Sequence, residues 1–100
     1  MTPKLSILIP TYNVEPYIKR GLDSIPWTDN IEVIARDDGS SDKTVEILQQ
    51  YKADHPEYNF TVISVKSGSA ASNYNALMQL ATGEYIQYMD SDDYFYTEKY

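Results

Sequence analysis

The fold of this 100-residue chain is decided by residues 31–42, which read Ile31-Glu32-Val33-Ile34-Ala35-Arg36-Asp37-Asp38-Gly39-Ser40-Ser41-Asp42. The run from Ile31 to Ala35 is short and rich in β-branched residues, which predicts a strand. The acidic pair and Gly39 end that strand in a turn, because glycine adopts turn conformations at little steric cost. Ser40 or Ser41 is then expected to cap a helix, with Asp42 in its first turn.

The same alternation of strand and helix patterns runs along the whole chain. Similar short runs predict three further strands, at Leu5 to Ile9, Phe60 to Val65 and Tyr85 to Met89. Pro10 is expected to end the first of these strands, because proline lacks a ladder N–H. Apolar residues three and four apart predict helices around Ile18 to Ile25, Val45 to Tyr51 and Ala70 to Ala81, with Pro26 and Gly83 as stops for the first and third.

The order β-α-β-α-β-α-β predicts a mainly parallel sheet with helices on both faces. The expected fold class is therefore a three-layer α/β/α, Rossmann-like unit, with residues 1–100 forming a single domain. In such sheets a ligand binds at the carboxyl ends of the strands. The polar residues at three predicted strand ends should then face one crevice, although they lie far apart in sequence: Pro10 to Asn13, Asp37 to Gly39 and Asp90 to Asp93.

Composition and charge exclude several classes of function. The formal net charge is -7 and the pI is about 4.4, which argues against binding nucleic acid or anionic lipid through bulk charge. Cysteine is absent and His55 is the one histidine, so thiolate chemistry and a histidine-rich metal site are not expected. The apolar runs are too short to span a bilayer, and no secretory pattern follows Met1, so the cytosol is the expected location.

The strongest local signal for chemistry is Asp90-Ser91-Asp92-Asp93, which follows the last predicted strand. Adjacent carboxylates repel one another, and their oxygens are the ligands that Mg²⁺ or Mn²⁺ prefers. A solvated acidic turn explains an isolated quartet of this kind about equally well. An EF-hand does not, because Tyr94 and Phe95 stand where a ligand and a glycine are required.

Two further strand ends carry weaker signals. A carboxylate of Asp37 or Asp38 can accept a hydrogen bond from a base N–H or a ribose hydroxyl, although a capped turn alone is the more common explanation. Tyr12, within Pro10-Thr11-Tyr12-Asn13, can stack on a nucleobase, although an exposed turn aromatic is the more common case. No glycine-rich phosphate loop is present, so phosphate would be held by a metal, a lysine or the backbone.

Together these motifs resemble the family 2 glycosyltransferases over essentially the whole chain. The resemblance rests on Ser6-Ile7-Leu8-Ile9-Pro10-Thr11-Tyr12-Asn13, Asp37-Asp38-Gly39-Ser40-Ser41-Asp42-Lys43-Thr44, and Ala81-Thr82-Gly83-Glu84-Tyr85-Ile86 leading into Asp90-Ser91-Asp92-Asp93. It implies a GT-A fold and the transfer of a sugar from a nucleoside diphosphate donor, most often UDP-linked, to an acceptor hydroxyl. It also implies help from a divalent cation and an inverting reaction.

The resemblance also implies roles for particular residues. Tyr12 would stack near the base, beside Pro10, and Asp37 would contact the uracil edge with Asp38 as a companion. Asp90 and Asp92 would form the DxD pair, with Asp92 as the metal ligand and Asp90 near ribose or metal. Asp93 would have a supporting part.

Two departures from the family pattern stand out. Tyr74 occupies the place before Asn75 where relatives carry an arginine near the nucleotide, and Lys43 and Lys66 are candidates to compensate. The chain is also less than half the usual length of the family domain. Its residues are therefore expected to form the donor-binding, N-terminal part. The catalytic base is expected in the acceptor-binding part.

Several alternatives and partners remain open at this stage. Without the acceptor-binding part, the chain alone would be inactive and act as a nucleotide- and metal-binding unit. Its exposed sheet edge would favour a homodimer. A signalling receiver domain also clusters aspartates at strand ends, but it places them after the first strand. The acceptor is not defined by the sequence, and the full-length protein could work at the inner face of the membrane.

Overall fold

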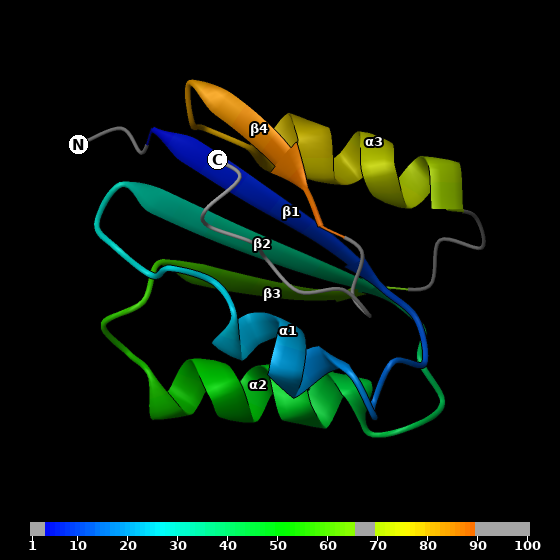
Figure 1. The fold of residues 1–100 in the computed structure, drawn as a ribbon. Coiled ribbons are helices and arrows are strands. Elements are labelled where there is room, and N and C mark those ends of the chain that lie inside the picture. Colours follow the sequence, from blue (N-terminus) through cyan, green and yellow to red (C-terminus); the bar gives the residue numbers. More distant parts are fainter. Residues whose placement is uncertain (1–3, 66–69, 90–100) are drawn as a thin grey trace.

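The computed structural model describes residues 4–65 and 70–89, and the side chains of residues 70–74 are not described. Strands and helices alternate along this part of the chain, as the sequence predicted (Figure 1). They are β1 (Leu5–Thr11), α1 (Ile18–Asp23), β2 (Ile31–Asp38), α2 (Thr44–Asp54), β3 (Phe60–Val65), α3 (Ala70–Leu80) and β4 (Tyr85–Tyr88).

The four strands form one parallel sheet in the order β3-β2-β1-β4. Leu5 of β1 pairs with Ile31 of β2 on one side and with Tyr85 of β4 on the other. The chain builds outward from β1 to β3 and then returns to the opposite side of β1 with β4. Since ligands of open α/β sheets bind where the strand order reverses, this topology directs attention to the carboxyl ends of β1 and β4.

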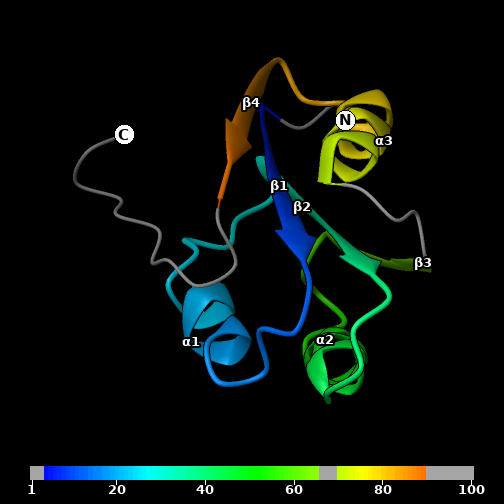
Figure 2. The ribbon, with the colours of Figure 1, turned by 90° about the vertical axis from the view of Figure 1, so that its right-hand side faces the viewer.

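The sheet is the middle of three layers. Helices α1 and α2 cover one face and α3 covers the other, which Figure 2 shows with the sheet seen nearly end-on. Ile7, Ile9 and Val33 point to the first face and pack with Leu22 of α1 and Leu48 of α2. On the other face Leu8 and Ile34 pack with Leu77 of α3. Burial on both faces explains the nearly continuous apolar runs of β1 and β2.

The prediction that Pro10 ends the first strand is wrong, because β1 continues to Thr11. The carbonyls of Lys4 and Leu8 accept hydrogen bonds from Tyr85 and Met89, so even-numbered residues of β1 turn their polar groups toward β4. Pairing with β4 stops at Leu8. The N–H that Pro10 lacks would face β4, whereas the pairing of β1 with β2 continues to Thr11, so the strand tolerates the proline.

The predicted start of the second helix also needs correction. Helix α2 begins at Thr44, and Asp42 lies before the helix rather than in its first turn. Neither serine caps it: Ser40 bonds to Asp37, and the Thr44 N–H donates to Asp42 Oδ1 at 2.9 Å. A short acidic side chain two residues before the helix takes the donor that a serine cap would have taken.

Gly83 has a different part from the predicted helix stop. Helix α3 ends at Leu80, and Gly83 instead lies against β1, where an added Cβ would come 2.7 Å from Ser6 Oγ and 2.8 Å from Ser6 N. The Gly83 N–H donates to Ser6 Oγ at 2.8 Å, and Ser6 Oγ donates to Glu32 Oε2 at 2.6 Å. Thr82 donates to the same Glu32 oxygen through its N–H and its hydroxyl, both at 3.0 Å.

The hydrogen bonds among Ser6, Glu32, Thr82 and Gly83 form a clamp that joins β1, β2 and the turn before β4 at the amino ends of the strands. The Glu32 side chain is buried in the middle of the sheet, where its charge is matched by donors from β1 and from the turn before β4. A buried carboxylate with several donors stays paired and fixes the groups that serve it. The clamp therefore holds the turn before β4 against β1 and β2.

An aromatic cluster closes the same end of the α1–α2 layer. Trp27 stacks on Tyr58 with 4.2 Å between ring centroids. His55 also stacks on Tyr58, with 4.6 Å between ring centroids. Burial, together with a hydrogen bond to Asp23, raises the pKa of the Tyr51 phenol beside them.

Helix α1 ends at Asp23, before the predicted stop at Pro26. Among the helices that the structure describes, none is long and apolar enough to cross a membrane.

Candidate nucleotide site at the strand ends

The parallel register brings together most of the site residues predicted from the sequence. Thr11 at the end of β1 pairs with Asp37 of β2, and Pro10 pairs with Arg36. Tyr12 follows Thr11 directly, and Asp38 is the last residue of β2. The predicted residues Pro10, Tyr12, Asp37 and Asp38 therefore lie at adjacent carboxyl ends, on the edge of the sheet where a ligand is expected.

Asp37 is the most tightly held of these side chains. It is completely buried, and its Oδ1 accepts hydrogen bonds from the Thr11 hydroxyl at 2.7 Å and the Ser40 hydroxyl at 2.5 Å. Its Oδ2 accepts the Ser40 N–H at 2.7 Å. A carboxylate has about four acceptor positions, so roughly one stays open. Direct contact with a base requires a shift in the groups that cover Asp37, and this role stays a prediction.

The loop after β1 is tied to the loop after β2 by Asn13. The Asn13 N–H donates to Ser40 Oγ at 2.8 Å, and Asn13 Oδ1 accepts the N–H groups of Ser41 at 2.8 Å and Asp42 at 3.3 Å. Asn13 has a φ of 52°, a left-handed conformation that asparagine tolerates better than most residues. Gly39 in the facing loop has a φ of 81°, where a side chain would be strained.

A second set of bonds continues the join toward the helices. The Glu15 N–H donates to Asp42 Oδ2 at 3.1 Å, and the Lys43 N–H donates back to Glu15 Oε1 at 2.9 Å. The Thr44 hydroxyl donates to Asp42 Oδ1 at 2.6 Å and accepts the Val14 N–H at 3.0 Å. The hydrogen bond from Thr44 is the main reason that the pKa of Asp42 lies below its usual range.

Tyr12 projects from these hydrogen-bonded loops. Its side chain is 60% exposed, next to residues whose backbones are fixed on both loops. Among the described aromatic residues, Tyr85 at the opposite end of the sheet has a similar exposure of 62%. Because Tyr12 lies at the carboxyl ends of the strands and Tyr85 does not, replacing each ring in turn distinguishes a binding role from simple surface exposure.

The predicted metal-binding residues Asp90 and Asp92, together with Asp93, lie outside the described residues. Met89 immediately precedes them, and its N–H donates to the Leu8 carbonyl of β1 at 3.0 Å. Met89, the last described residue before the acidic quartet, therefore lies beside Leu8 of β1. Over residues 4–65 and 70–89 no cluster of three or more potential metal ligands occurs.

The departures noted in the sequence are only partly visible. Tyr74 lies within α3, but its side chain is not described, and Lys66 lies outside the described residues. Asn75 is exposed on α3. Lys43 is exposed at the start of α2, where its backbone N–H is bonded to Glu15. Its position in the loop after β2 keeps it a candidate cation for the nucleotide.

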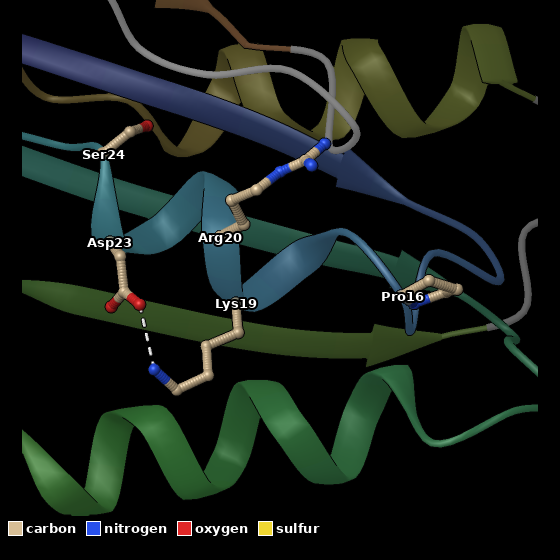
Figure 3. A pocket seen from close by; sticks show the side chains of 5 residues that line it. All are labelled: Pro16, Lys19, Arg20, Asp23 and Ser24. Carbon is tan, nitrogen blue, oxygen red and sulfur yellow. Dashed lines mark hydrogen bonds and ion pairs between the residues drawn. The ribbon is translucent and has the colours of Figure 1, made fainter.

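A separate hollow of about 500 Å³ lies along α1 and is lined by Pro16, Lys19, Arg20, Asp23 and Ser24 (Figure 3). Its two cations are already engaged. Lys19 Nζ lies 2.9 Å from Asp23 Oδ2, and the Arg20 guanidinium lies 5.8 Å from the Tyr17 ring centroid. The hollow is therefore a poor site for a phosphate, and the strand ends remain the candidate site.

Sequence reasoning missed the residues that join distant parts of the chain, both at the candidate site and at the opposite end of the sheet. Asn13 and Ser40 were seen only as part of a turn and as a possible cap, and Glu32 was read as part of a strand. One signal was available for Glu32: a single carboxylate inside an apolar strand has to be paired if it is buried. The cross-loop bonds join residues 27 to 30 positions apart, which no local pattern reveals.

Comparison with known proteins agrees with this geometry. Residues 6–100 match the family model described as "Glycosyl transferase family 2", and the chain belongs to this family. It is 40% identical over 100 residues to a poly(ribitol-phosphate) beta-glucosyltransferase of Bacillus spizizenii, covering 95% of this chain and 16% of that protein.

Two solved structures are similar in fold. One is S. aureus TarS 1-349 in complex with UDP, with a TM-score of 0.77 and 36% identity over 91% of this chain and 28% of that one. The other is the mannosyltransferase PcManGT from Pyrobaculum calidifontis in complex with GDP-Man and Mn²⁺, with a TM-score of 0.84 and 28% identity over 95% of this chain and 29% of that one. The mainly parallel sheet is thus the GT-A, Rossmann-like fold, and the chain spans less than a third of these relatives.

Proposed function

We propose that this chain binds the nucleotide of a nucleoside diphosphate sugar, as the donor-binding part of a glycosyltransferase. The observation that carries the proposal is the placement of Tyr12 and Asp37 at the carboxyl ends of adjacent strands, in a fixed pair of loops. UDP is the proposed nucleotide, because the neighbour described as a UDP complex is 36% identical to this chain.

In this proposal Tyr12 supplies a stacking surface for the base and Pro10 lies beside it. Base–aromatic stacking is worth about 1–3 kcal/mol per base. Asp37, with Asp38 next to it, offers a carboxylate acceptor to the base edge or ribose once the cover over Asp37 shifts. The hydroxyls of Thr11 and Ser40 keep that carboxylate oriented in the meantime.

Asp90 and Asp92 are the proposed holders of a divalent cation, Mg²⁺ or Mn²⁺. Their carboxylate oxygens are of the hard type that such ions prefer, and a similar structure is described as a complex with Mn²⁺. A bound cation offsets the charge of the diphosphate and of the leaving group. Without one, a diphosphate would be repelled by three neighbouring carboxylates and by a chain of net charge -7.

The proposed transfer is a single inverting displacement. An acceptor oxygen forms a bond to the anomeric carbon while the bond from that carbon to the diphosphate breaks, and the acceptor proton passes to a carboxylate base. No residue of this chain is assigned as that base. The chain alone is therefore proposed to bind donor without transferring it, which is also what the alternative of a non-catalytic binding unit requires.

The strand β4 suggests a further property of the isolated chain. It lies at one edge of the described sheet, and its exposed apolar side chains are Tyr85, Ile86 and Tyr88. Unpaired strand edges with apolar side chains favour association. We propose that two copies pair along β4 when nothing else covers it.

Calorimetric titration with UDP tests the proposed function. We expect binding in Mn²⁺ and little or none in EDTA, and we expect Tyr12→Ala to weaken it by about 5- to 150-fold. Tyr85→Ala is the matched control, since it removes an equally exposed ring from the other end of the sheet. Equal affinity in Mn²⁺ and EDTA would contradict the metal, and equal affinity for Tyr12→Ala and wild type would contradict the site.

A further inference from the structure

Among the bonds that join the two loops at the strand ends, those of one hydroxyl group reach both Asn13 and Asp37. Ser40 Oγ accepts the Asn13 N–H at 2.8 Å and donates to Asp37 Oδ1 at 2.5 Å. Asn13 directly follows Tyr12 in the chain. Ser40 thus connects the backbone next to the exposed ring with the buried carboxylate.

The neighbouring serine has no such position. Ser41 Oγ makes a contact of 3.4 Å with Asn13 Oδ1 and is exposed, whereas the Ser41 backbone N–H makes the shorter bond of 2.8 Å to the same oxygen. Removing the Ser41 hydroxyl leaves that bond in place. The two serines are therefore adjacent residues of the same type with different structural roles.

Asn13 holds the other half of the join. Its left-handed backbone is a conformation that most L-residues adopt only at a cost. It persists here because its side-chain oxygen serves the donors of the facing loop. The turn at Asn13 sets the direction in which the chain leaves Tyr12.

We propose that Ser40 and Asn13 are positioning residues for the nucleobase: they hold Tyr12 and Asp37 in a fixed relation before the nucleotide arrives. This inference rests on the proposed function and extends it to the residues that hold Tyr12 and Asp37 in place. A prearranged site binds more tightly, because binding does not have to order the loops. The Ser40 hydroxyl, together with that of Thr11, couples the Tyr12 side of the site to the Asp37 carboxylate.

The coupling predicts an effect that depends on the base. Ser40→Ala removes the bond to the backbone next to Tyr12 and one donor of the Asp37 carboxylate, while the bonds of Asn13 Oδ1 to the facing loop remain, so UDP should bind about tenfold more weakly. Inorganic pyrophosphate with Mg²⁺ has no base, so it should bind to Ser40→Ala with the same affinity as to wild type. Ser41→Ala should change neither affinity, and Ser40→Thr, which keeps a hydroxyl, should restore UDP binding.

The experiment is a titration of wild type and these variants with UDP and, separately, with pyrophosphate. Asn13→Gly is the second variant, since glycine keeps the left-handed turn and removes the side-chain oxygen on an exposed residue. It should also weaken UDP selectively. Wild-type UDP affinity in Ser40→Ala would overturn the inference, and so would equal losses for UDP and pyrophosphate, which indicate general loosening. If the wild-type chain fails to bind UDP, the proposed function itself is overturned.

Discussion

Replacing Gly83 by alanine should destabilise the fold sharply. The added Cβ would lie 2.7 Å from Ser6 Oγ, 2.8 Å from Ser6 N and 3.0 Å from the Leu5 carbonyl carbon. Two of these three neighbours are backbone atoms of β1, so rotation of a side chain does not relieve the contact. The turn before β4 has to move away from the sheet.

The size of the effect follows from two contributions. Overpacking of this kind costs about 1–3 kcal/mol. Moving the turn also weakens the hydrogen bonds that Gly83 and Thr82 make to Ser6 and Glu32, each worth about 0.5–1.5 kcal/mol. We therefore expect Gly83→Ala to lower the free energy of unfolding by about 2–4 kcal/mol, a large part of the stability of a small domain.

Urea unfolding followed by tryptophan fluorescence measures this change, because Trp27 is the one tryptophan. Thr82→Ala is the comparison, since it removes one hydroxyl bond to Glu32 while its N–H bond remains. We expect Thr82→Ala to cost about 1 kcal/mol, clearly less than Gly83→Ala. A Gly83→Ala chain as stable as wild type would refute the view that close backbone approach fixes this turn.

Three other properties should respond to simple changes. The lowered pKa of Asp42 means that its contribution to stability is present above the ordinary value of 3.8 and is lost as the pH falls through the folded-state pKa; Asp42→Asn should therefore flatten acid unfolding there, and unchanged pH dependence would speak against it. Ile86→Lys should shift the chain from dimer to monomer in sedimentation, and a wild-type chain that stays monomeric at high concentration would exclude association. The chain alone should not transfer sugar from UDP-sugars, and any turnover would show that a catalytic base lies within it.

The sequence predicted the architecture well, because the fold class depends on periodic patterns. The four strands and three helices were found from apolar spacing and β-branched runs, and each lies where the pattern placed it to within a few residues. The ends were less accurate. Pro10 was expected to stop β1, yet the strand continues because it stays paired with β2 to Thr11, and the N–H that proline lacks would face β4.

The candidate site was predicted as a set of residues but not as an arrangement. Strand-end motifs and family resemblance identified Tyr12 and Asp37, and the parallel register brings their strand ends together. The burial of Asp37 was not foreseen. It depends on hydroxyls of Thr11 and Ser40 that only the folded chain places around it.

The clamp at Glu32 shows the limit most clearly. Its partners Ser6 and Thr82 lie 26 and 50 residues away in sequence. A local pattern cannot pair residues at such separations, and Gly83 looked like a helix stop for the same reason. Close approach between a turn and a distant strand is a property of the assembled sheet.

The central claim is that a nucleoside diphosphate binds at the carboxyl ends of the strands. The most direct test is an NMR titration of the ¹⁵N-labelled chain with UDP in Mg²⁺. We expect the amide shifts to change around Tyr12, Asn13 and Ser40, and to stay unchanged around Glu32 and Thr82 at the opposite end of the sheet. Changes concentrated at the Glu32 end, or none at saturating UDP, would contradict the account.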